Sequence, residues 1–296
     1  MKKLQLKNFR PFKDERVFDF KDQVTVIAGV NGHGKTAILD SLSILLSRLL
    51  PQISRAVGGY KPLSPGDHHH GTNTMLMSIS ANCAGYPVTL SLSRDMNDRR
   101  TRASGLPRAL KNTIRAAYGS DPTREGDAAP IAVYYTTDRA GYKLPNKMPK
   151  VVPRGQSAAY YGALWDRRMD YRDLMARLAV SVQLDPARQG ENPNFIGRQT
   201  VETMNRVLAV FLEGFNGLRV DDSRFRLVVD KNGVPLDIPH LSDGERSFLA
   251  IVTDLCRRLT LANPGLNNPL DGQGVALIDE LELHLHPTWQ RDVIEK

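Results

Sequence analysis

One short segment has residue types and spacing that suit phosphate chemistry. Residues 29–36 read Gly-Val-Asn-Gly-His-Gly-Lys-Thr, follow a β-branched run and precede apolar residues at helical spacing. Glycines allow backbone conformations that turn N–H groups toward a phosphate, and the N-terminus of the following helix adds positive potential. This context distinguishes a phosphate-binding loop from a glycine-rich turn that binds nothing. The segment therefore predicts a nucleotide site.

The side chains of this segment indicate separate roles toward ATP. We expect Lys35 to reach the β- and γ-phosphates and the Thr36 hydroxyl to ligate Mg²⁺. Asn31 is placed near the γ-phosphate and the attacking water. Kinases, GTPases and motor proteins share such a loop, so the class depends on the second half of the chain. The residues of this segment expected to contact ATP are Asn31, Gly32, His33, Gly34, Lys35, Thr36 and Ala37.

A second candidate site lies at residues 239–247, just before a run with strong helical periodicity. Ser242 is a good N-cap and Glu245 follows three residues later, which is the pattern of a capping box. One interpretation is a helix start with no further task. The other is an anion site, in which Ser242, Gly244 and Glu245 approach a phosphate.

A third candidate is the acidic end of an apolar strand at residues 274–280, which read Gly-Val-Ala-Leu-Ile-Asp-Glu. Asp279 would organise Mg²⁺ through water, and Glu280 would polarise the water that attacks the γ-phosphate. Two acids at a strand end could also be simply solvated. The order of the three segments along the chain favours the catalytic interpretation.

Alternation and apolar runs predict the elements that position the phosphate loop. Residues 3–7 and 16–20 alternate as strands, and residues 24–28 form a continuous apolar run that predicts a buried strand. Residues 35–50 have helical periodicity, and Pro51 is expected to end that helix.

The rest of the chain predicts a mixture of hairpins and helices. The turn residues 231–233, Lys-Asn-Gly, are typical of a hairpin. The expected strands are residues 75–82, 88–93, 131–136, 224–230 and 234–238, and the expected helices are residues 160–184 and 198–215.

Composition limits the classes of protein. The chain has 296 residues, of which 41% are hydrophobic and 24% charged, so a packed core is expected. No apolar run reaches the roughly 18 residues that span a membrane, and the N-terminus lacks the apolar stretch of a signal peptide. Cys83 and Cys256 give no disulfide framework. We expect a cytoplasmic protein without a membrane partner.

The net charge of +8 is concentrated in residues 94–154, which hold 13 Lys and Arg against 6 Asp and Glu, a surplus of 7. Such a basic insert could meet the phosphates of DNA or RNA. It could equally be an ordinary solvated face, and the sequence leaves both interpretations open.

Residues 242–249 together with 277–290 resemble the bacterial AAA family ATPases, which include OLD-like and PtuA-type proteins with heads similar to RecF and SMC heads. Ser242 and its neighbours resemble the ABC signature, with Asp243 and Glu245 as departures from its usual Leu-Ser-Gly-Gly-Gln. The resemblance implies that two heads dimerise around ATP, and that Ser242 meets the γ-phosphate held by the other subunit. It also implies that Arg10 lies close to the nucleotide.

This resemblance carries expectations about partners and about missing parts. Members often serve anti-phage defence with a nuclease partner, or DNA repair, whereas a transporter subunit fits the large insert poorly. Gln156 and Gln183 are candidates for the Q-loop glutamine of such heads. The family continues past the equivalent of Lys296 with another strand and a switch histidine, so we expect a longer protein.

The predicted fold class is α/β, an ABC-type head in which a mixed sheet near the N-terminus joins a mostly parallel central sheet. We expect three parts. Residues 1–50 and 216–296 form the two halves of the ATPase core, and residues 51–215 form an inserted, largely helical lobe.

Overall fold

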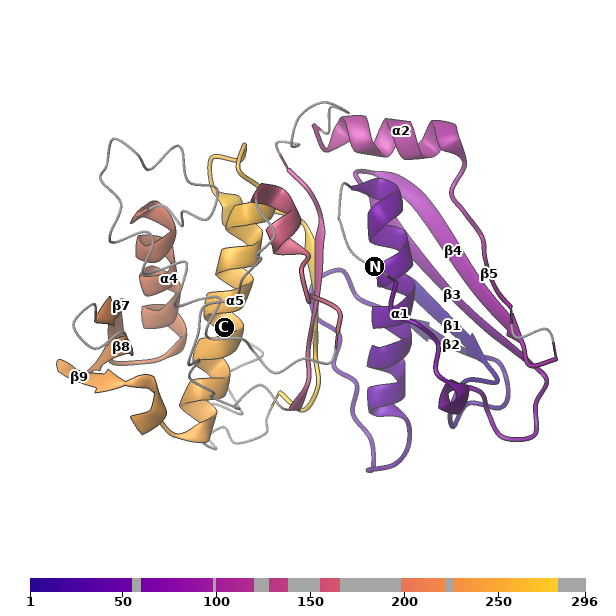
Figure 1. The fold of residues 1–296 in the computed structure, drawn as a ribbon, viewed down its shortest axis with the longest axis horizontal. Helices are drawn as coiled ribbons and strands as arrows, with labels where there is room; N and C mark the ends of the chain where they lie inside the picture. The colour runs from indigo at the N-terminus through magenta and orange to yellow at the C-terminus, as the bar shows by residue number, and fades with distance from the viewer. Residues whose placement is uncertain are drawn as a thin grey trace. The chain divides into compact units, whose positions relative to one another are not determined.

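The structure is a computed structural model that describes residues 1–54, 60–97, 100–119, 128–137, 155–165, 198–221 and 226–281. The chain divides into two compact units, and each is described by itself (Figure 1). The first unit comprises Met1–Tyr134, Gly162–Trp165 and Gly272–Leu277. The second comprises Tyr135–Tyr161, Asp166–Asp271 and Ile278–Lys296.

A five-stranded sheet in the order β2-β1-β3-β4-β5 dominates the first unit. Alternation places one face inside: Leu4 pairs with Ile79, and both side chains are buried. Every pairing in this sheet is antiparallel, so the mixed sheet expected near the N-terminus is wrong in that detail. The strands are β1 (Lys3–Lys7), β2 (Arg16–Asp19), β3 (Thr74–Cys83), β4 (Tyr86–Asp95) and β5 (Thr101–Ala103).

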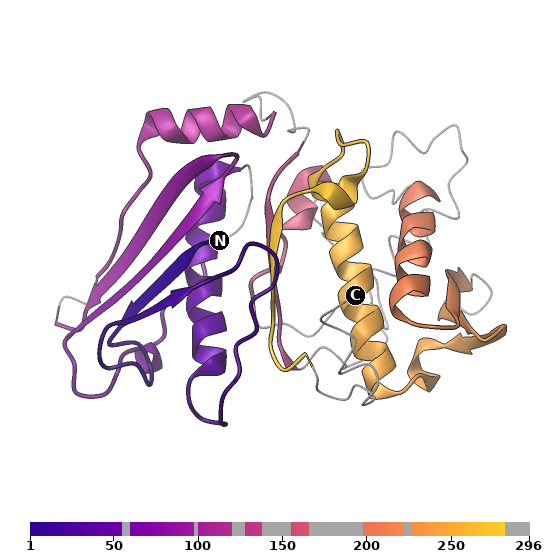
Figure 2. The ribbon, with the colours of Figure 1, turned by 180° about the vertical axis from the view of Figure 1, so that it is seen from behind.

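Helix α1 (Lys35–Ile53) lies against the buried face of this sheet, as the two opposite views show (Figure 1 and Figure 2). The apolar positions that predicted the helix are all buried. The helix continues past Pro51, where the sequence predicted its end, by two residues to Ile53. Helix α2 (Arg108–Ala117) packs beside α1. The buried apolar positions of α1 are Ile38, Leu42, Leu45, Leu46 and Leu49.

The expected strand at residues 24–28 is not formed. These residues have no ladder partner, and Val24 and Val26 are 55% and 62% exposed. A β-branched run favours extended backbone, but a strand also requires a neighbour to bond with. The apolar pattern carried no information about that neighbour.

Strands β6 (Ile131–Tyr135) and β10 (Gly274–Ile278) form a two-stranded pair. The Ile131 amide donates to Gln273 O at 3.0 Å and the Asp279 amide to Tyr135 O at 2.9 Å, an order that makes the pair parallel. All of β6 is buried, as predicted, whereas in β10 only Leu277 is. The expectation that β10 is a buried strand is therefore correct for its conformation and wrong for its burial.

The second unit contains an antiparallel sheet in the order β7-β8-β9 and two helices that lie side by side (Figure 2). The hairpin turn at Asn232 and Gly233 has φ of 52° and 79°, the two left-handed residues of the predicted turn. The helices and strands of the second unit are η3 (Gly155–Ala159), α4 (Arg198–Phe211), β7 (Phe215–Asp221), β8 (Arg226–Lys231), β9 (Val234–Asp237) and α5 (Asp243–Ala262). It also has two three-residue 3₁₀ turns among its described residues, η5 (Ile238–His240) and η6 (Pro269–Asp271), and the first unit has η1 (Pro65–Asp67).

Packing in the second unit holds α5 against α4 and the small sheet. Its apolar core includes Leu208 of α4, Leu227 of β8 and Leu249 of α5, each fully buried. Because apolar burial is the main stabilising term in folding, this core fixes where the N-terminus of α5 lies within the unit.

The α/β class is confirmed, and the three-part domain division stays a prediction. The helix expected at residues 160–184 falls mostly outside the described residues, and its described part, up to residue 165, forms turns. Within the described parts of the chain, α1 is the one helix long and apolar enough to cross a membrane, and 72% of its most apolar window is buried in the fold.

Candidate nucleotide-binding site

The phosphate loop forms the turn that leads into α1. Gly32 and Gly34 have φ of 81° and 91°, a region that L side chains rarely adopt. Gly34 is the N-cap of α1, and no side chain caps this helix. Since the first turn of a helix presents N–H groups toward its N-terminus, this end is suited to bind an anion.

Gly34 is also fixed by close neighbours. A Cβ atom there would lie 2.7 Å from Cζ of Phe12 and 2.8 Å from Cγ of Pro11. No atom would lie within 4 Å of a Cβ at Gly29 or Gly32. The loop therefore needs glycine at position 34 for two independent reasons, its backbone conformation and the space available.

Lys35 points back into the loop it follows. Its Nζ donates to Gly29 O at 2.7 Å, to Val30 O at 3.3 Å and to Asn31 Oδ1 at 3.2 Å. A lysine ammonium is a compact charge with three donors. These bonds hold it over the loop, where a bound phosphate would accept the same donors.

Arg10 lies in the same unit, with its side chain bound to two carboxylates. Its guanidinium donates to Asp40 Oδ2 at 2.5 Å and to Asp67 Oδ1 at 3.0 Å. Burial alone would lower the pKa of Arg10, but the charges of Asp40 and Asp67 raise it above the ordinary value. Asp40 is on α1, one turn after Thr36, so the guanidinium is anchored beside the helix that begins at the loop.

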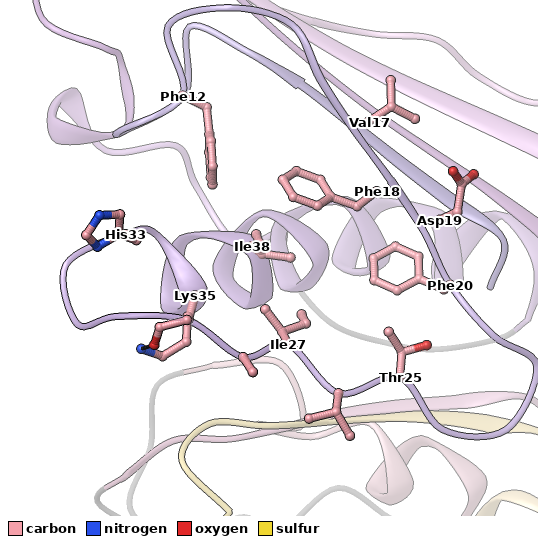
Figure 3. A pocket seen from close by; sticks show the side chains of 13 residues that line it. Phe12, Val17, Phe18, Asp19, Phe20, Thr25, Ile27, His33, Lys35 and Ile38 are labelled. Carbon is pink, nitrogen blue, oxygen red and sulfur yellow. Dashed lines mark hydrogen bonds between the residues drawn. The ribbon is translucent and has the colours of Figure 1, made fainter.

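An open pocket of about 490 Å³ adjoins the phosphate loop within the first unit. Figure 3 shows the rings of Phe12, Phe18 and Phe20 across the pocket from Ile27, with Lys35 toward one end. The rings of Phe12 and Phe18 meet edge to face with centroids 5.6 Å apart. An aromatic-walled hollow of this volume next to a phosphate loop has the size and chemistry to take a purine base.

The N-terminus of α5 is capped by side chains. Glu245 N donates to Ser242 Oγ at 3.3 Å, and Ser242 N donates to Glu245 Oε2 at 2.9 Å. Lys231 Nζ donates to the other oxygen, Glu245 Oε1, at 2.6 Å. Burial would raise the pKa of Glu245, but the bonds from Lys231 and Ser242 lower it below the ordinary value. Ser242 itself is exposed.

The capping box is thus confirmed as structure, and the Glu245 carboxylate is committed to it. That leaves the Ser242 hydroxyl exposed at this helix end, beside the buried Gly244 and the exposed Asp243, whose carboxylate pairs with Arg246. The two interpretations of the segment do not exclude each other, because an N-cap hydroxyl can accept from the helix and still donate to an anion.

The acidic strand end is formed as predicted. Asp279 follows β10 with its amide bonded to Tyr135 O, and it is 8% exposed. Glu280 is exposed and has a φ of 46°, a conformation that costs energy for a residue with a side chain. Backbone strain of this kind is concentrated at functional sites, and Glu280 is the residue that the sequence predicts to polarise the attacking water.

The oxygen donors proposed for Mg²⁺ fit that ion in kind. Thr36 offers a hydroxyl and Asp279 a carboxylate, both hard oxygen ligands. Thr36 belongs to the first unit and Asp279 to the second. Within the described residues no cluster of three or more His, Cys, Asp or Glu side chains is present.

Sequence reasoning missed the groups that neutralise or anchor these residues. Lys231 pairs with Glu245, and Asp40 joins Arg10 to Lys61, whose Nζ lies 3.3 Å from Asp40 Oδ1. Each pair depends on packing between distant segments, which no local sequence pattern indicates.

The structure describes one of the two candidate glutamines. Gln156 is buried and its amide donates to Ala262 O at the end of α5 at 2.7 Å, which is a structural contact. Gln183, and residues 282–290 that carried part of the resemblance, lie outside the described residues.

Comparisons with known proteins place these features in a family. The profile of a family described as "AAA domain, putative AbiEii toxin, Type IV TA system" matches residues 96–295, and one described as "AAA domain" matches residues 3–113. A curated relative, "Retron Ec83 probable ATPase" of Escherichia coli, is 26% identical over 356 residues, which cover 99% of this chain and 65% of that protein.

Two further relatives agree. "Retron Vc95 probable ATPase" of Vibrio cholerae serotype O1 biovar El Tor is 23% identical, with 100% of this chain and 67% of that protein covered. "Septu protein PtuA" of Bacillus thuringiensis is 32% identical over 102 residues, 32% of this chain and 26% of that protein. The chain spans about two thirds of the length of the retron relatives. These matches confirm the resemblance to PtuA-type ATPases.

Proposed function

The chain belongs to the AAA-domain family whose profile matches residues 96–295, and we propose that it is an ATP-binding and ATP-hydrolysing head that dimerises around ATP. The observation that carries the proposal is the phosphate loop. It combines left-handed glycines, a helix N-terminus with no side-chain cap and Lys35 held over the loop. The relatives named as ATPases support the same activity at the level of the family.

The chain's own groups supply the steps of hydrolysis. Lys35 exchanges its bonds to loop carbonyls for bonds to the β- and γ-phosphates. Thr36 and Asp279 would hold Mg²⁺, which would supply neutralisation of charge on the phosphates. Glu280 orients and polarises the water that attacks the γ-phosphate. The adenine base of ATP lies in the pocket lined by the rings of Phe12, Phe18 and Phe20.

Dimerisation follows from what α5 can offer. Ser242 and Gly244 of one copy meet the γ-phosphate bound at Lys35 of the other, and Lys231 keeps the nearby Glu245 from repelling that phosphate by neutralising its charge. ATP then holds two heads together and hydrolysis releases them. The switch is driven by the difference in affinity between ATP and ADP for the closed pair.

We further propose that this switch serves an anti-phage defence system with a nuclease or other effector partner, and that DNA or RNA stimulates it. The retron and Septu relatives support the first statement, and the basic surplus of residues 94–154 supports the second. Two arginines of that surplus are at the exposed edge strand β5, where Arg100 precedes the strand and Arg102 lies within it.

Steady-state ATP hydrolysis by the full-length protein tests the enzyme assignment. Wild type is expected to hydrolyse ATP, and Glu280→Gln to bind ATP while losing at least about a hundredfold in kcat. Glu213→Gln, the same change at an exposed glutamate of the second unit, is the matched control and should equal wild type. Equal background rates for wild type and Glu280→Gln, with ATP bound, would mean a scaffold that uses ATP without turnover.

Partner dependence is tested separately. Double-stranded DNA and RNA are added to the hydrolysis assay at about 50 and 200 mM salt, with and without the protein encoded beside it. Stimulation that falls steeply with salt supports a phosphate-backbone contact. Stimulation by the protein partner alone would remove nucleic acid from the proposal.

A further inference from the structure

Helix α5 carries a buried ionic cluster that the proposed function does not use. Asp254 accepts from Arg257 NH2 at 2.8 Å and from Arg258 Nε at 2.6 Å. All three residues are at most 7% exposed. The spacing of three and four residues puts them on one face of the helix.

The cluster extends beyond α5 to two other segments of the second unit. Arg258 NH1 donates to Ala159 O at 2.6 Å and to Tyr161 O at 3.1 Å. The Tyr135 hydroxyl donates to Asp254 Oδ2 at 3.1 Å. Burial would raise the pKa of Asp254, but the two guanidinium groups hold it at about 2, so this carboxylate stays charged at neutral pH.

Tyr135 is the joint in this arrangement, because its two ends bind different elements. Its hydroxyl binds α5, while its carbonyl accepts the amide of Asp279 at 2.9 Å. Asp279 is the candidate magnesium ligand and precedes Glu280. One residue therefore links α5 to the acidic strand end through two hydrogen bonds.

The other end of α5 is the candidate signature. Asp254 lies 11 residues after Asp243, or about 17 Å along the helix at 1.5 Å per residue. A helix core closed by backbone hydrogen bonds resists compression. Hence a pull on Ser242 at the first turn moves Asp254 with it.

Stability alone is a weak explanation for the cluster. Phe248, Leu249 and Val252 already anchor α5 in the apolar core. Replacing a buried ion pair by apolar side chains is often neutral or stabilising, so such pairs add little net stability. The cluster instead fixes how α5 is oriented relative to the segments it contacts, because charge-assisted hydrogen bonds have narrow geometry.

We propose that Tyr135 and Asp254 are positioning residues that couple the Ser242 end of α5 to Asp279 and Glu280, so that engagement of a second head at Ser242 sets the acids for hydrolysis. This inference rests on the proposed function and deepens it by naming the path within one subunit. Both side chains are buried within the second unit.

The test compares kcat and KM for ATP in the full-length protein with Tyr135→Phe, which removes one hydroxyl and keeps the ring. We expect kcat to fall about five- to tenfold with KM within about twofold and Tm within about 2 °C. Tyr86→Phe, the same change at an exposed tyrosine of β4, is the matched control and should match wild type. An unchanged kcat in Tyr135→Phe, or an equal loss in both variants, overturns the proposal.

Ser242→Ala supplies a second, independent readout. If the path exists, the double variant Ser242→Ala with Tyr135→Phe loses less in kcat than the product of the single losses, because both changes break one path. Multiplicative losses overturn the coupling. A purely structural role would appear in Tm and leave the kcat cycle additive.

Amide hydrogen exchange in the ATP-free protein separates this inference from the proposed function. In Asp254→Asn, or in Tyr135→Phe should the first variant not fold, the peptide covering residues 275–281 is expected to exchange at least about threefold faster than in wild type. Unchanged exchange overturns the coupling. Absence of hydrolysis in wild type would refute the enzyme assignment and leave the exchange result to decide the coupling.

Discussion

Two helix N-termini in this protein are completed in opposite ways. Helix α1 begins at Gly34 with no side-chain cap, and the loop before it is shaped by left-handed glycines. Helix α5 begins at Ser242 with a complete capping box, and a lysine from the neighbouring hairpin neutralises the cap. The first helix end presents its backbone, whereas the second presents the Ser242 hydroxyl beside an Asp243–Arg246 ion pair.

The difference indicates a division of tasks. A glycine-based end can enclose a phosphate because no side chain competes for its N–H groups. A capped end is already stable without ligand and adds only a weak contact, which suits a surface that must close and release. We therefore expect changes in the loop before α1 to abolish binding, and changes at α5 to affect closure.

Removing the loop's cation should have the largest effect on this comparison. Lys35→Ala deletes a charge that now donates to Gly29, Val30 and Asn31. Loss of a charge-assisted bond is worth about 1.5–3 kcal/mol, so the Kd for ATP should rise about 10- to 100-fold. Isothermal titration measures it.

Lys7→Ala, an exposed lysine on β1, controls for net charge. An equal loss of affinity in both variants would show that Lys35 acts through overall charge only, and the special role of the α1 end would be lost.

A single methyl group in the loop should come next. Gly34→Ala forces φ of 91° on alanine and places Cβ 2.7 Å from the Phe12 ring. Strain of about 1–3 kcal/mol should lower Tm by several degrees and weaken ATP binding. Gly29→Ala is the matched change, because its Cβ meets nothing within 4 Å. Thermal unfolding with and without ATP compares them, and an unchanged Tm in Gly34→Ala would refute the strain argument.

The loop was predictable from sequence because its determinants are local. Glycine spacing, Lys35 and the apolar stripe of α1 lie within about twenty consecutive residues, and the structure has each where the pattern predicted. The capping box of α5 is local in the same sense. Ser242 and Glu245 are three residues apart and their two hydrogen bonds are formed.

What could not be predicted depends on distant contacts. Residues 24–28 have a strand's composition, but their exposure is decided by which segments lie beside them. The pairing of Lys231 with Glu245 requires the β8–β9 hairpin to fold onto α5. The bond between Tyr135 and Asp254 joins residues 119 positions apart. The periodicity of apolar residues and the residue types of turns do not indicate which distant residues pair.

The α5 cap allows its two tasks to be separated. Ser242→Ala removes the cap oxygen and should cost about 1 kcal/mol of stability together with ATP-dependent dimerisation. Ser242→Asp keeps a good N-cap, but its charge would repel a phosphate. We expect near wild-type Tm and no ATP-dependent dimer for Ser242→Asp. Light scattering with Glu280→Gln as background measures the dimer, and dimerisation by Ser242→Asp would show that the helix end does not meet a phosphate.

The smallest expected effect is a pH dependence confined to the capped end. Bonds from Lys231 and Ser242 lower the pKa of Glu245 below its ordinary 4.5 in the folded protein. A carboxylate with a depressed folded pKa contributes stability above the unfolded pKa and loses it as pH falls through the folded value. Thermal unfolding between about pH 7 and pH 3 should therefore show a steeper loss below pH 4.5 for wild type than for Glu245→Gln. The loop before α1 has no such carboxylate in its cap, so Gly29→Ala should show the same dependence of Tm on pH as wild type. Parallel profiles of Tm against pH for wild type and Glu245→Gln would mean that the Lys231–Glu245 pair does not stabilise the N-terminus of α5.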